Sequence, residues 1–471
     1  MIYINLLSYF LFIGVIGYYF VVNMQWYNYK IERVIFHHTK VWWHFVYFLI
    51  PFILFEFLSG VTDNQYGFII VLLYLPLFTL WYRGIDKKLV FTRRVKRFFG
   101  LLFLFALFIT FSFEFFTIFI PILLASFISM FIEMMLFDGF KKSAKEKIEN
   151  MDNLIVIGIT ASYGKTSIKN YVEHILQAKY NTYATPRSVN TLGGIVKDIN
   201  NDLPSDTEVY IVEMGARGKG DIADIATLVN PHYVIVGKIG PAHIEYFKSM
   251  ENIRNTKMEI LQTNRLQKAW IHESAVINPI ENIYQFGKDI TDIRASLDGV
   301  SFILEGIEYF ANVLGAFNAI NLAASIKISK ILGIDENTLR QRLTSLKSVP
   351  HRLQRIDAGG KIILDDSFNG NIDGMMASFE LVESYDGRKV IITPGLVEVD
   401  DALNIKVAQR VNKVFDVVII TGELNYALFK EYINPEKLHK LSNKADMEEM
   451  LVTQTIAGDL ILFANDAPSF I

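Results

Sequence analysis

The sequence predicts an α/β protein that carries transmembrane helices at its N-terminus. Long aromatic and aliphatic runs dominate the first 140 residues, whereas short apolar segments alternate with amphipathic helical ones from residue 151 onward. Apolar runs of about 20 residues predict membrane-spanning helices, and alternating strands and helices predict a parallel sheet flanked by helices. We therefore expect a membrane region over residues 1–140, a central P-loop domain over 150–345 and a C-terminal Rossmann-like α/β domain over 346–471.

Composition limits the class of protein. The 471 residues are enough for two or three domains. The formal net charge of −3 gives no indication of nucleic-acid binding, and the hydrophobic content of 51% is high for a soluble protein. The chain has no cysteine, which excludes disulfides, thiolate metal sites and a cysteine nucleophile.

The membrane region contains several runs long enough to cross a hydrocarbon core of about 30 Å. Residues 2–23 carry no charge. A cleaved signal peptide is the weaker interpretation, because a basic segment and a small-residue cleavage site are both missing. Residues 41–59 and 66–82 are two further candidate spans.

Residues 98–137 are too long for one span. Because Glu114 and Pro121 lie near the middle, we expect two short helices that turn at the membrane face, with a re-entrant hairpin as the alternative. Glu56 and Glu114 could be functional, since ionisable residues in spans are costly. Both lie near predicted span ends, which favours an interfacial position.

Basic residues predict the orientation. They gather in the first connection, in the third connection and after the last span, whereas Asp63 is the only charge between spans two and three. The basic residues are Lys30, Arg33, Lys40, Arg83, Lys87, Lys88, Arg93, Arg94, Lys96, Arg97, Lys141, Lys142, Lys145 and Lys147. By the positive-inside rule, five spans with the N-terminus outside place all three groups, and the large C-terminal part, on the cytoplasmic side of the plasma membrane.

The stretch 154–167 indicates phosphate binding. An apolar strand leads into a loop that closes on Gly164, Lys165 and Thr166, and a helix with one apolar face follows. In such a loop, backbone N–H groups and the helix N-terminus hold phosphate, Lys165 supplies a positive charge and the Thr166 hydroxyl can ligate Mg²⁺. The usual first glycine is one place out of register, since Ile159 occupies its position. We expect ATP binding, with a structural turn as the alternative.

The second half of the chain is a series of predicted strands and helices. A helix is expected at 336–346, and a domain boundary near 347–360, where Val349-Pro350 and Gly359-Gly360 punctuate the chain. Strands are expected at 154–157, 209–213, 233–237, 361–364, 389–393, 417–421 and 459–463.

Three further residues are candidates for the site. Glu213 ends a predicted strand, a position where carboxylates beside a P-loop handle Mg²⁺, although it could instead cap the next turn. His243 follows another strand, and Lys257 lies on a predicted helix. Taken alone, such a histidine or lysine is more often structural or solvated.

Together these segments resemble the Mur ligases, ATP-dependent amide-forming enzymes of bacterial cell-wall synthesis. Within that family the resemblance is strongest to the member that adds D-alanyl-D-alanine. Six stretches carry it in order: Gly158-Ile-Thr-Ala-Ser-Tyr-Gly-Lys-Thr166, Thr185-Pro-Arg-Ser-Val-Asn-Thr-Leu-Gly193, Glu213-Met-Gly-Ala216, Ala242-His-Ile-Glu245 with Lys257-Met-Glu-Ile260, Leu314-Gly-Ala-Phe-Asn-Ala-Ile-Asn-Leu-Ala-Ala324, and His351-Arg-Leu353 with Asp365-Asp-Ser-Phe-Asn-Gly370.

The resemblance implies a role for each matched residue. Lys165, His243 and Lys257 would be catalytic, and Lys257 aligns with the family's carbamylated lysine, in which captured CO₂ turns a cation into a carboxylate. Mg²⁺ would be held by Thr166, Glu213, His243 and Lys257. ATP would be bound by Gly164, Lys165, Thr166, Ser167, Asn318, Asn321, Arg352 and Asp366. The acyl substrate would face Asn190 and Thr191.

The implied reaction is attack of a carboxylate on the γ-phosphate of ATP, followed by displacement of phosphate from the acyl phosphate by an amine. Positioning and charge neutralisation supply most of the catalysis of such a step. Closure of the last domain would exclude water, which otherwise hydrolyses the acyl phosphate.

The chain departs from the family pattern in front of the P-loop. The domain that binds the uridine nucleotide is missing, and five predicted spans stand in its place. That favours a membrane-associated carboxylate substrate, with a lipid-linked one as an option, and an amino acid or peptide as the amine. Envelope-synthesis proteins are candidate partners, and no nucleic acid is expected. The family's loop glycine is Ala161 here, its adenine-side histidine is Phe317, and residues 458–466 lack the usual Lys-Gly-Ser.

Two other functions remain open from the sequence. A poly-γ-glutamate-synthase-like polymerase also combines a membrane anchor with a Mur-type ATPase, and a long homopolymer product would distinguish it. A non-catalytic nucleotide-binding scaffold for envelope enzymes is the third hypothesis. The presence together of Lys165, Glu213, His243 and Lys257 argues against a scaffold.

Overall fold

The chain was studied as a computed structural model, which describes residues 2–27, 29–36, 38, 40–62, 67–85, 87–113, 116–242, 244–275, 281–368, 371–397, 399 and 401–465. His243, Asp63, Glu114, Asn369 and Gly370, on which some of the expectations rest, lie outside the described residues. The chain divides into two compact units, Met1–Phe140 and Lys141–Ile471.

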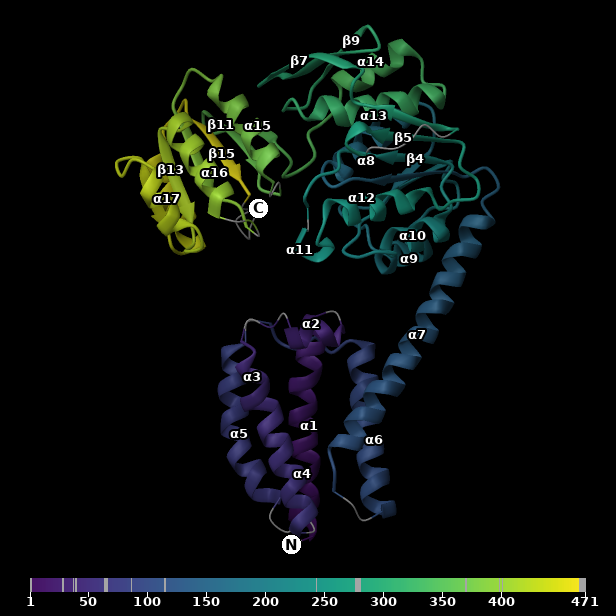
Figure 1. Ribbon diagram of the computed structural model, residues 1–471, viewed down its shortest axis with the longest axis vertical. Helices are drawn as coiled ribbons and strands as arrows, with labels where there is room; N and C mark the ends of the chain where they lie inside the picture. The colour runs from purple at the N-terminus through teal and green to yellow at the C-terminus, as the bar shows by residue number, and fades with distance from the viewer. Residues whose placement is uncertain are drawn as a thin grey trace. The chain divides into compact units, whose positions relative to one another are not determined.

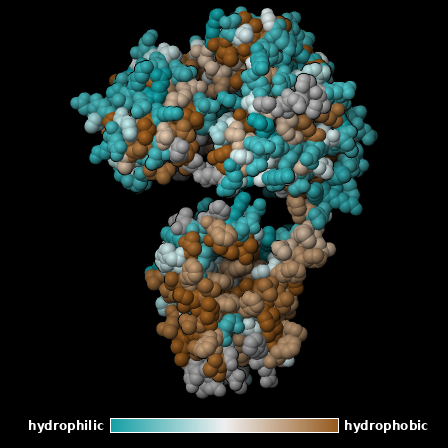
Figure 2. Space-filling view, in the orientation of Figure 1, coloured by the Kyte–Doolittle hydropathy of each residue, from teal (hydrophilic) through white to brown (hydrophobic). Residues whose placement is uncertain are grey.

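The N-terminal unit is built of apolar helices. Five helical segments in the described part of the chain are long and apolar enough to cross a membrane. Helices satisfy every backbone hydrogen bond internally, which a lipid environment requires. Hydrophobic side chains dominate the face of this unit that Figure 2 shows. Its elements are α1 (Ile2–Trp26), α2 (Ile31–Phe36), α3 (Trp42–His44), a π-helical turn (Phe45–Leu49), α4 (Ile50–Thr62), α5 (Gly67–Gly84), α6 (Arg93–Phe113) and α7 (Phe119–Glu149).

Aromatic side chains pack the inside of this unit. Phe12 of α1 stacks on Phe55 of α4, with ring centroids 4.7 Å apart, and meets Tyr74 of α5 edge to face at 5.2 Å. Helices α1 and α6 approach closely at Gly17, where a Cβ atom would lie 2.7 Å from the Leu102 side chain. Small residues at such crossings allow close packing between apolar helices.

Two helices cover residues 98–137, as expected, but the prediction that they are short is wrong. Helix α6 has 21 residues and α7 has 31, and each is long enough to span. Pro121 is tolerated because it lies in the first turn of α7, where its missing N–H has no helical partner. The carboxylate of Glu56 accepts the N–H groups of Ile118 and Phe119, at 2.7 and 2.9 Å, and thereby caps the start of α7.

A six-stranded parallel sheet forms the middle of the second unit (Figure 1). Its order is β2-β3-β1-β4-β5-β6, so β2 and β3 lie on one side of β1 and the chain then crosses to β4, β5 and β6 on the other side. In sheets of this kind, ligands bind at the carboxyl ends of the strands where the direction reverses. The strands are β1 (Ile155–Thr160), β2 (Thr182–Ala184), β3 (Val209–Glu213), β4 (Tyr233–Val236), β5 (Lys268–His272) and β6 (Ile283–Phe286).

Helices pack on both faces of this sheet, and a small antiparallel sheet follows it. The strands β1, β3 and β4 correspond to the three that the sequence predicts, whereas β2, β5 and β6 lie outside the predicted strands. The helices are α8 (Lys165–Leu176), α9 (Leu192–Asn201), α10 (Asp221–Val229), α11 (Ile244–Phe247), α12 (Met250–Met258), α13 (Asn318–Ile331) and α14 (Glu336–Thr344). The antiparallel strands are β7 (Ile290–Ser296), β8 (Gly299–Leu304) and β9 (Ile307–Ala311).

A second six-stranded sheet forms the C-terminal part, in the order β10-β11-β15-β12-β13-β14. Only the edge strand β10 is antiparallel to its neighbour. Phe379 and Phe415 pack edge to face in its core. Its elements are β10 (Gln354–Ala358), β11 (Lys361–Asp366), α15 (Ile372–Glu383), β12 (Lys389–Thr393), α16 (Asp401–Val414), β13 (Val417–Thr421), α17 (Tyr426–Tyr432), β14 (Leu438–Leu441), α18 (Met447–Gln454) and β15 (Leu460–Ala464).

Candidate functional site

The loop between β1 and α8 has the geometry of an anion-binding turn. Gly164 is the N-cap of α8 and has a φ of +80°, in the left-handed region that glycine favours. No side chain caps the helix, so its first N–H groups are free to meet an anion. Thr166 lies in the first turn of α8, and Ser167 behind it is buried.

Lys165 turns back onto this loop. Its Nζ donates to the carbonyl oxygens of Ala161 and Ser162, at 2.9 and 3.2 Å. Desolvation lowers the pKa of Lys165, and the Glu213 carboxylate acts in the opposite direction. An ammonium group held only by loop carbonyls can exchange them for phosphate oxygens at little cost.

Asn321 of α13 presses directly against the loop. A Cβ atom on Gly164 would lie 2.5 Å from Asn321 Oδ1, so only glycine fits there. Asn321 donates to Asn318 Oδ1 at 2.9 Å, and Asn318 donates to the Leu314 carbonyl at 2.7 Å. Gly164 and Asn321, which are 157 positions apart in the chain, are therefore in direct contact at this loop.

Glu213 lies at the carboxyl end of β3 with its side chain 1% exposed. Its Oε1 accepts a hydrogen bond from Asn190 Nδ2 at 3.0 Å. Among the described residues, its buried Oε2 has no hydrogen-bond partner, although Lys169 Nζ lies 3.4 Å away. A buried carboxylate oxygen with spare acceptor capacity is a ready ligand for a cation.

Lys169 is a residue of this site that the sequence reasoning missed. Its Nζ donates to the carbonyls of Thr185 (2.6 Å) and Arg187, and it faces Glu213. Burial lowers the pKa of Lys169, while Glu213 acts to raise it. The available signal was spacing, because Lys169 comes one helical turn after Lys165 and so shares its side of α8.

The segment before α9 lies against Glu213. Asn190 donates to Glu213, and its carbonyl accepts the Gly215 N–H at 2.7 Å. A Cβ on Gly215 would lie 2.7 Å from the Asn190 side chain. Thr191 is the N-cap of α9, and its hydroxyl accepts the Gly194 N–H at 3.3 Å. The structure therefore places Asn190 in the crevice and gives Thr191 a capping role.

Lys257 is buried near the end of α12, with 4% of its surface exposed. Burial, and then the charge of Lys165, lower its pKa to about 7, against the opposing effect of Asp221, Glu259 and Glu213. A large fraction of this amine is therefore neutral near neutral pH. That is the state in which an amine reacts with CO₂, because only the free lone pair is nucleophilic.

Arg352 comes from the start of the C-terminal part. It stands between His351 and Leu353, whose φ angles of +62° and +51° are uncommon for residues other than glycine. Burial lowers the pKa of Arg352, while Asp366 and Glu213 act to raise it. Asp366 accepts the Leu353 N–H at 3.1 Å and the Ser378 hydroxyl at 2.8 Å, so it braces the segment that carries Arg352.

The loop after β4 connects the P-loop to the C-terminal part. The Ser162 hydroxyl donates to the Gly240 carbonyl at 2.9 Å, and the Tyr163 ring fills the space beside Gly240. Burial, and then Asp373, raise the pKa of Tyr163 to about 12. Lys238 Nζ forms an ion pair with Asp373 Oδ2 of α15 at 3.0 Å.

The residues present fit a phosphate-associated Mg²⁺ ion. Glu213 offers an unused buried oxygen and Thr166 a hydroxyl in the first helical turn. Lys257 could serve only as a carbamate, because an ammonium would repel the ion. Within the described part of the chain, no three His, Asp or Glu side chains gather into a metal site. A magnesium ion held chiefly by phosphate and water needs no such cluster.

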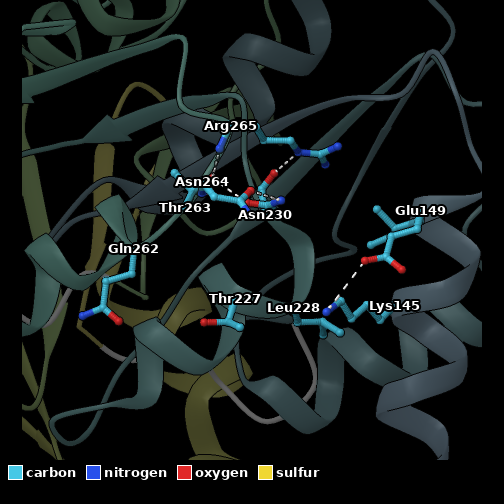
Figure 3. A pocket seen from close by; sticks show the side chains of 10 residues that line it. Lys145, Glu149, Thr227, Leu228, Asn230, Gln262, Thr263, Asn264 and Arg265 are labelled. Carbon is cyan, nitrogen blue, oxygen red and sulfur yellow. Dashed lines mark hydrogen bonds and ion pairs between the residues drawn. The ribbon is translucent and has the colours of Figure 1, made fainter.

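A polar pocket of about 360 Å³ lies at the amino ends of the strands, opposite the candidate site (Figure 3). It is formed by the loops that precede β4 and β5 and by the end of α7. Its polar groups mostly satisfy one another: Thr263 and Asn264 bond to Asn230, and Arg265 donates to the Asn230 and Val229 carbonyls. This pocket is therefore separate from the candidate site and has few free polar groups.

Comparison with known proteins agrees with this fold. The Mur ligase middle domain matches residues 159–329. The chain is 26% identical to UDP-N-acetylmuramoyl-tripeptide–D-alanyl-D-alanine ligase of Bacillus subtilis (strain 168), over 65% of this chain and 72% of that protein. It is 29% identical to the enzyme of the same name from Synechocystis sp., over 52% of this chain and 55% of that protein.

A solved structure gives the same result. MurF ligase from Thermotoga maritima in complex with ADP superposes with a TM-score of 0.60 and 26% identity, covering 70% of this chain and 80% of that one. The fold and site define a protein of the Mur ligase family, the ATP-dependent ligases that form amide bonds. Over its middle and C-terminal parts the chain is MurF-like.

Proposed function

We propose that this protein is a membrane-anchored, ATP- and Mg²⁺-dependent amide ligase that adds an amino acid or peptide to a membrane-associated precursor of the cell envelope. The observation that carries the proposal is the convergence of Lys165, Glu213 and Lys257, with Arg352 from the C-terminal part, at the carboxyl edge of the sheet. Glu213 and Arg352 affect the pKa of Lys165, Glu213 affects the pKa of Arg352, and the pKa of Lys257 is affected by Lys165 and Glu213.

The first chemical step would join two anions. An oxygen of the substrate carboxylate attacks the γ-phosphorus of ATP, the bond to the β–γ bridging oxygen breaks, and ADP leaves. Lys165 would leave the Ala161 and Ser162 carbonyls to hold the phosphates, and the free N–H groups of α8 would bind the same oxygens. Arg352 would add a second positive charge, so that repulsion between the anions falls. Mg²⁺, when bound, would neutralise phosphate charge.

The second step would form the amide bond. The amine attacks the acyl carbon of the acyl phosphate, the carbon–oxygen bond to phosphate breaks, and the amine loses a proton. The Asn190 segment is the natural place for the acyl group, because it contacts Glu213 at the carboxyl end of β3, the neighbour of the strand that leads into the P-loop. The segment of Arg352 and the Lys238–Asp373 pair would hold the C-terminal part closed against water.

Lys257 would act as a carbamate. Its buried amine, with a pKa of about 7, can attack CO₂ and lose a proton, which yields a carboxylate near Glu213. The lost positive charge would relieve its repulsion with Lys165, and the new negative charge would suit a cation. The carbamate is thus favoured by the same surroundings that penalise the ammonium.

The five apolar helices support a location in the plasma membrane. Basic residues lie where α5 ends, where α6 begins and after the apolar part of α7. They favour an orientation with the N-terminus outside and the ligase part in the cytoplasm. A precursor that stays at the membrane would be presented to the anchored enzyme without diffusion through the cytoplasm. We therefore favour a lipid-linked carboxylate as the acyl substrate.

Turnover by the full-length protein tests the proposal. Purified protein in phosphatidylglycerol nanodiscs is given ATP, Mg²⁺, a membrane extract and single amino acids, and ADP release is recorded with mass spectrometry of the products. We expect ADP and phosphate only when both carboxylate and amine are present, and no turnover by Lys165→Ala. A long homopolymer product would favour a polymerase. Normal envelope synthesis in cells whose only copy of the protein is the Lys165→Ala variant would favour a scaffold.

A further inference from the structure

The N-terminal unit contains a groove of about 290 Å³ that is apolar except at one end. Its walls come from α1, α6 and α7, and the apolar part is lined by Val21, Phe98, Leu123 and Phe127. Leu123 and Phe127 are exposed and one helical turn apart, so they form a continuous apolar strip. A groove of this kind accepts a hydrocarbon chain.

The other end of the groove carries a positive charge. The Arg94 guanidinium lies over the Tyr29 ring, 3.4 Å from its centroid. Across the described residues, no carboxylate lies within ion-pair distance of Arg94, whereas Arg97, almost one turn along α6, pairs with Glu133. Stacking on a ring leaves the N–H donors of a guanidinium free at its edges, where they match the oxygens of a phosphate.

One further observation favours an anion at this end. Arg94 is in the first turn of α6, where the helix dipole has the same sign as the arginine charge. Beside Leu123 and Phe127 the groove also contains Ser126, whose buried hydroxyl has no hydrogen-bond partner among the described residues. By contrast, Ser8 of α1 satisfies its hydroxyl by donating to the Ile4 carbonyl one turn back. An unsatisfied hydroxyl among apolar side chains is costly unless a ligand meets it.

We propose that this groove is a binding site for an anionic lipid, with the phosphate of its headgroup at Arg94 and a hydrocarbon chain against Phe98, Leu123 and Phe127. This inference rests on the proposed function, because the lipid would be the membrane anchor of the carboxylate substrate. The protein would then recognise its substrate by the phosphate of the lipid anchor. Bulk lipid around the helices would show neither a preference for phosphate nor a dependence on Arg94.

Photocrosslinking tests the site on the full-length protein. The protein is placed in phosphatidylcholine nanodiscs that contain a small fraction of diazirine-labelled phosphatidic acid, and crosslinked peptides are mapped by mass spectrometry. We expect crosslinks at residues 123–130 of α7. Arg94→Gln should lower their yield about fivefold, which corresponds to about 1 kcal/mol for one arginine at an anionic headgroup. Arg93→Gln is the matched control, because Arg93 is exposed, precedes Arg94 on the same helix and does not line the groove.

A second probe isolates the phosphate. Diazirine-labelled diacylglycerol has the same chains without the phosphate, and it should crosslink at these residues only weakly. Equal yields from both probes, an unchanged yield in Arg94→Gln, or crosslinks spread evenly over the exposed faces of α4 and α5 would each overturn the lipid site. Binding of a fluorescent ADP analogue, measured in the same nanodiscs, separates the two proposals. Bound nucleotide without groove crosslinks contradicts the groove alone, whereas a wild-type protein that binds no nucleotide contradicts the proposed function.

Discussion

Lys169 Nζ and Glu213 Oε2 lie 3.4 Å apart, and the two side chains are only 2% and 1% exposed. Lys169 also holds the carbonyls of Thr185 and Arg187, at the start of the segment that leads to Asn190. One buried cation therefore connects the helix of the P-loop, the expected metal ligand and the loop expected to face the acyl substrate. Removal of one partner from such a pair leaves the other as an uncompensated buried charge.

Lys169→Met should destabilise the ligase part by roughly 3–5 kcal/mol, because Glu213 loses the cation with which it forms a buried ion pair. Thermal unfolding of the purified protein should show a clearly lower melting temperature. Lys197→Met, at an exposed position of α9, is the control and should change little. The double variant Lys169→Met/Glu213→Gln should recover part of the loss, and a Lys169→Met protein as stable as wild type would show that the pair is unimportant.

Lys257 should carry a carbamate that forms as pH rises. The folded-state pKa of about 7 is lowered from the usual lysine value, so the amine is protonated below about pH 7 and neutral above it. With ¹³C-bicarbonate, NMR should show a carbamate signal that increases through about pH 7 and disappears in Lys257→Met. Absence of that signal from wild type above this pH, while nucleotide still binds, would refute the carbamate and leave the P-loop assignment unaffected.

Gly164→Ala should abolish tight nucleotide binding. The left-handed φ of +80° costs a residue with a Cβ about 1–2 kcal/mol, and the new methyl group would meet Asn321 Oδ1 at 2.5 Å. Titration with a fluorescent ADP analogue measures the effect. Gly139→Ala in α7 is the matched control, since nothing lies within 4 Å of its Cβ position. The additional change Asn321→Ala should remove the clash, but it leaves the φ strain and removes an expected ATP-binding side chain, so at most partial recovery is expected.

Arg352→Gln should reduce kcat about 100-fold, because the side chain would stabilise charge that develops during phosphoryl transfer. The dissociation constant for ADP should change much less. Arg355→Gln is a suitable control, since Arg355 lies three residues away and pairs with Asp298 and Asp357 on the surface. If both variants behave alike, Arg352 has no special place in the reaction.

Much of this molecule could be predicted because its signals are local. The strand before the P-loop, the Gly164-Lys165-Thr166 turn and the helix after it are adjacent in the chain, so their pattern is complete within one short segment. The strands β2, β5 and β6 escaped prediction because short strands with mixed composition depend on their neighbours for stability. The antiparallel strands β7, β8 and β9 were not predicted from the sequence for the same reason.

The sequence by itself determined that apolar helices precede an ATP-binding α/β ligase, because apolar length and loop glycines act through the nearest residues. Only the tertiary structure decided which charges face one another. It placed Lys169 against Glu213, pressed Asn321 on Gly164 and assigned Thr191 to a helix cap. In the described part of the chain it left no carboxylate within ion-pair distance of Arg94, whose guanidinium lies over the Tyr29 ring. The pKa of Lys257 depends on burial and on Lys165, which is 92 positions away, and no local pattern carries that information.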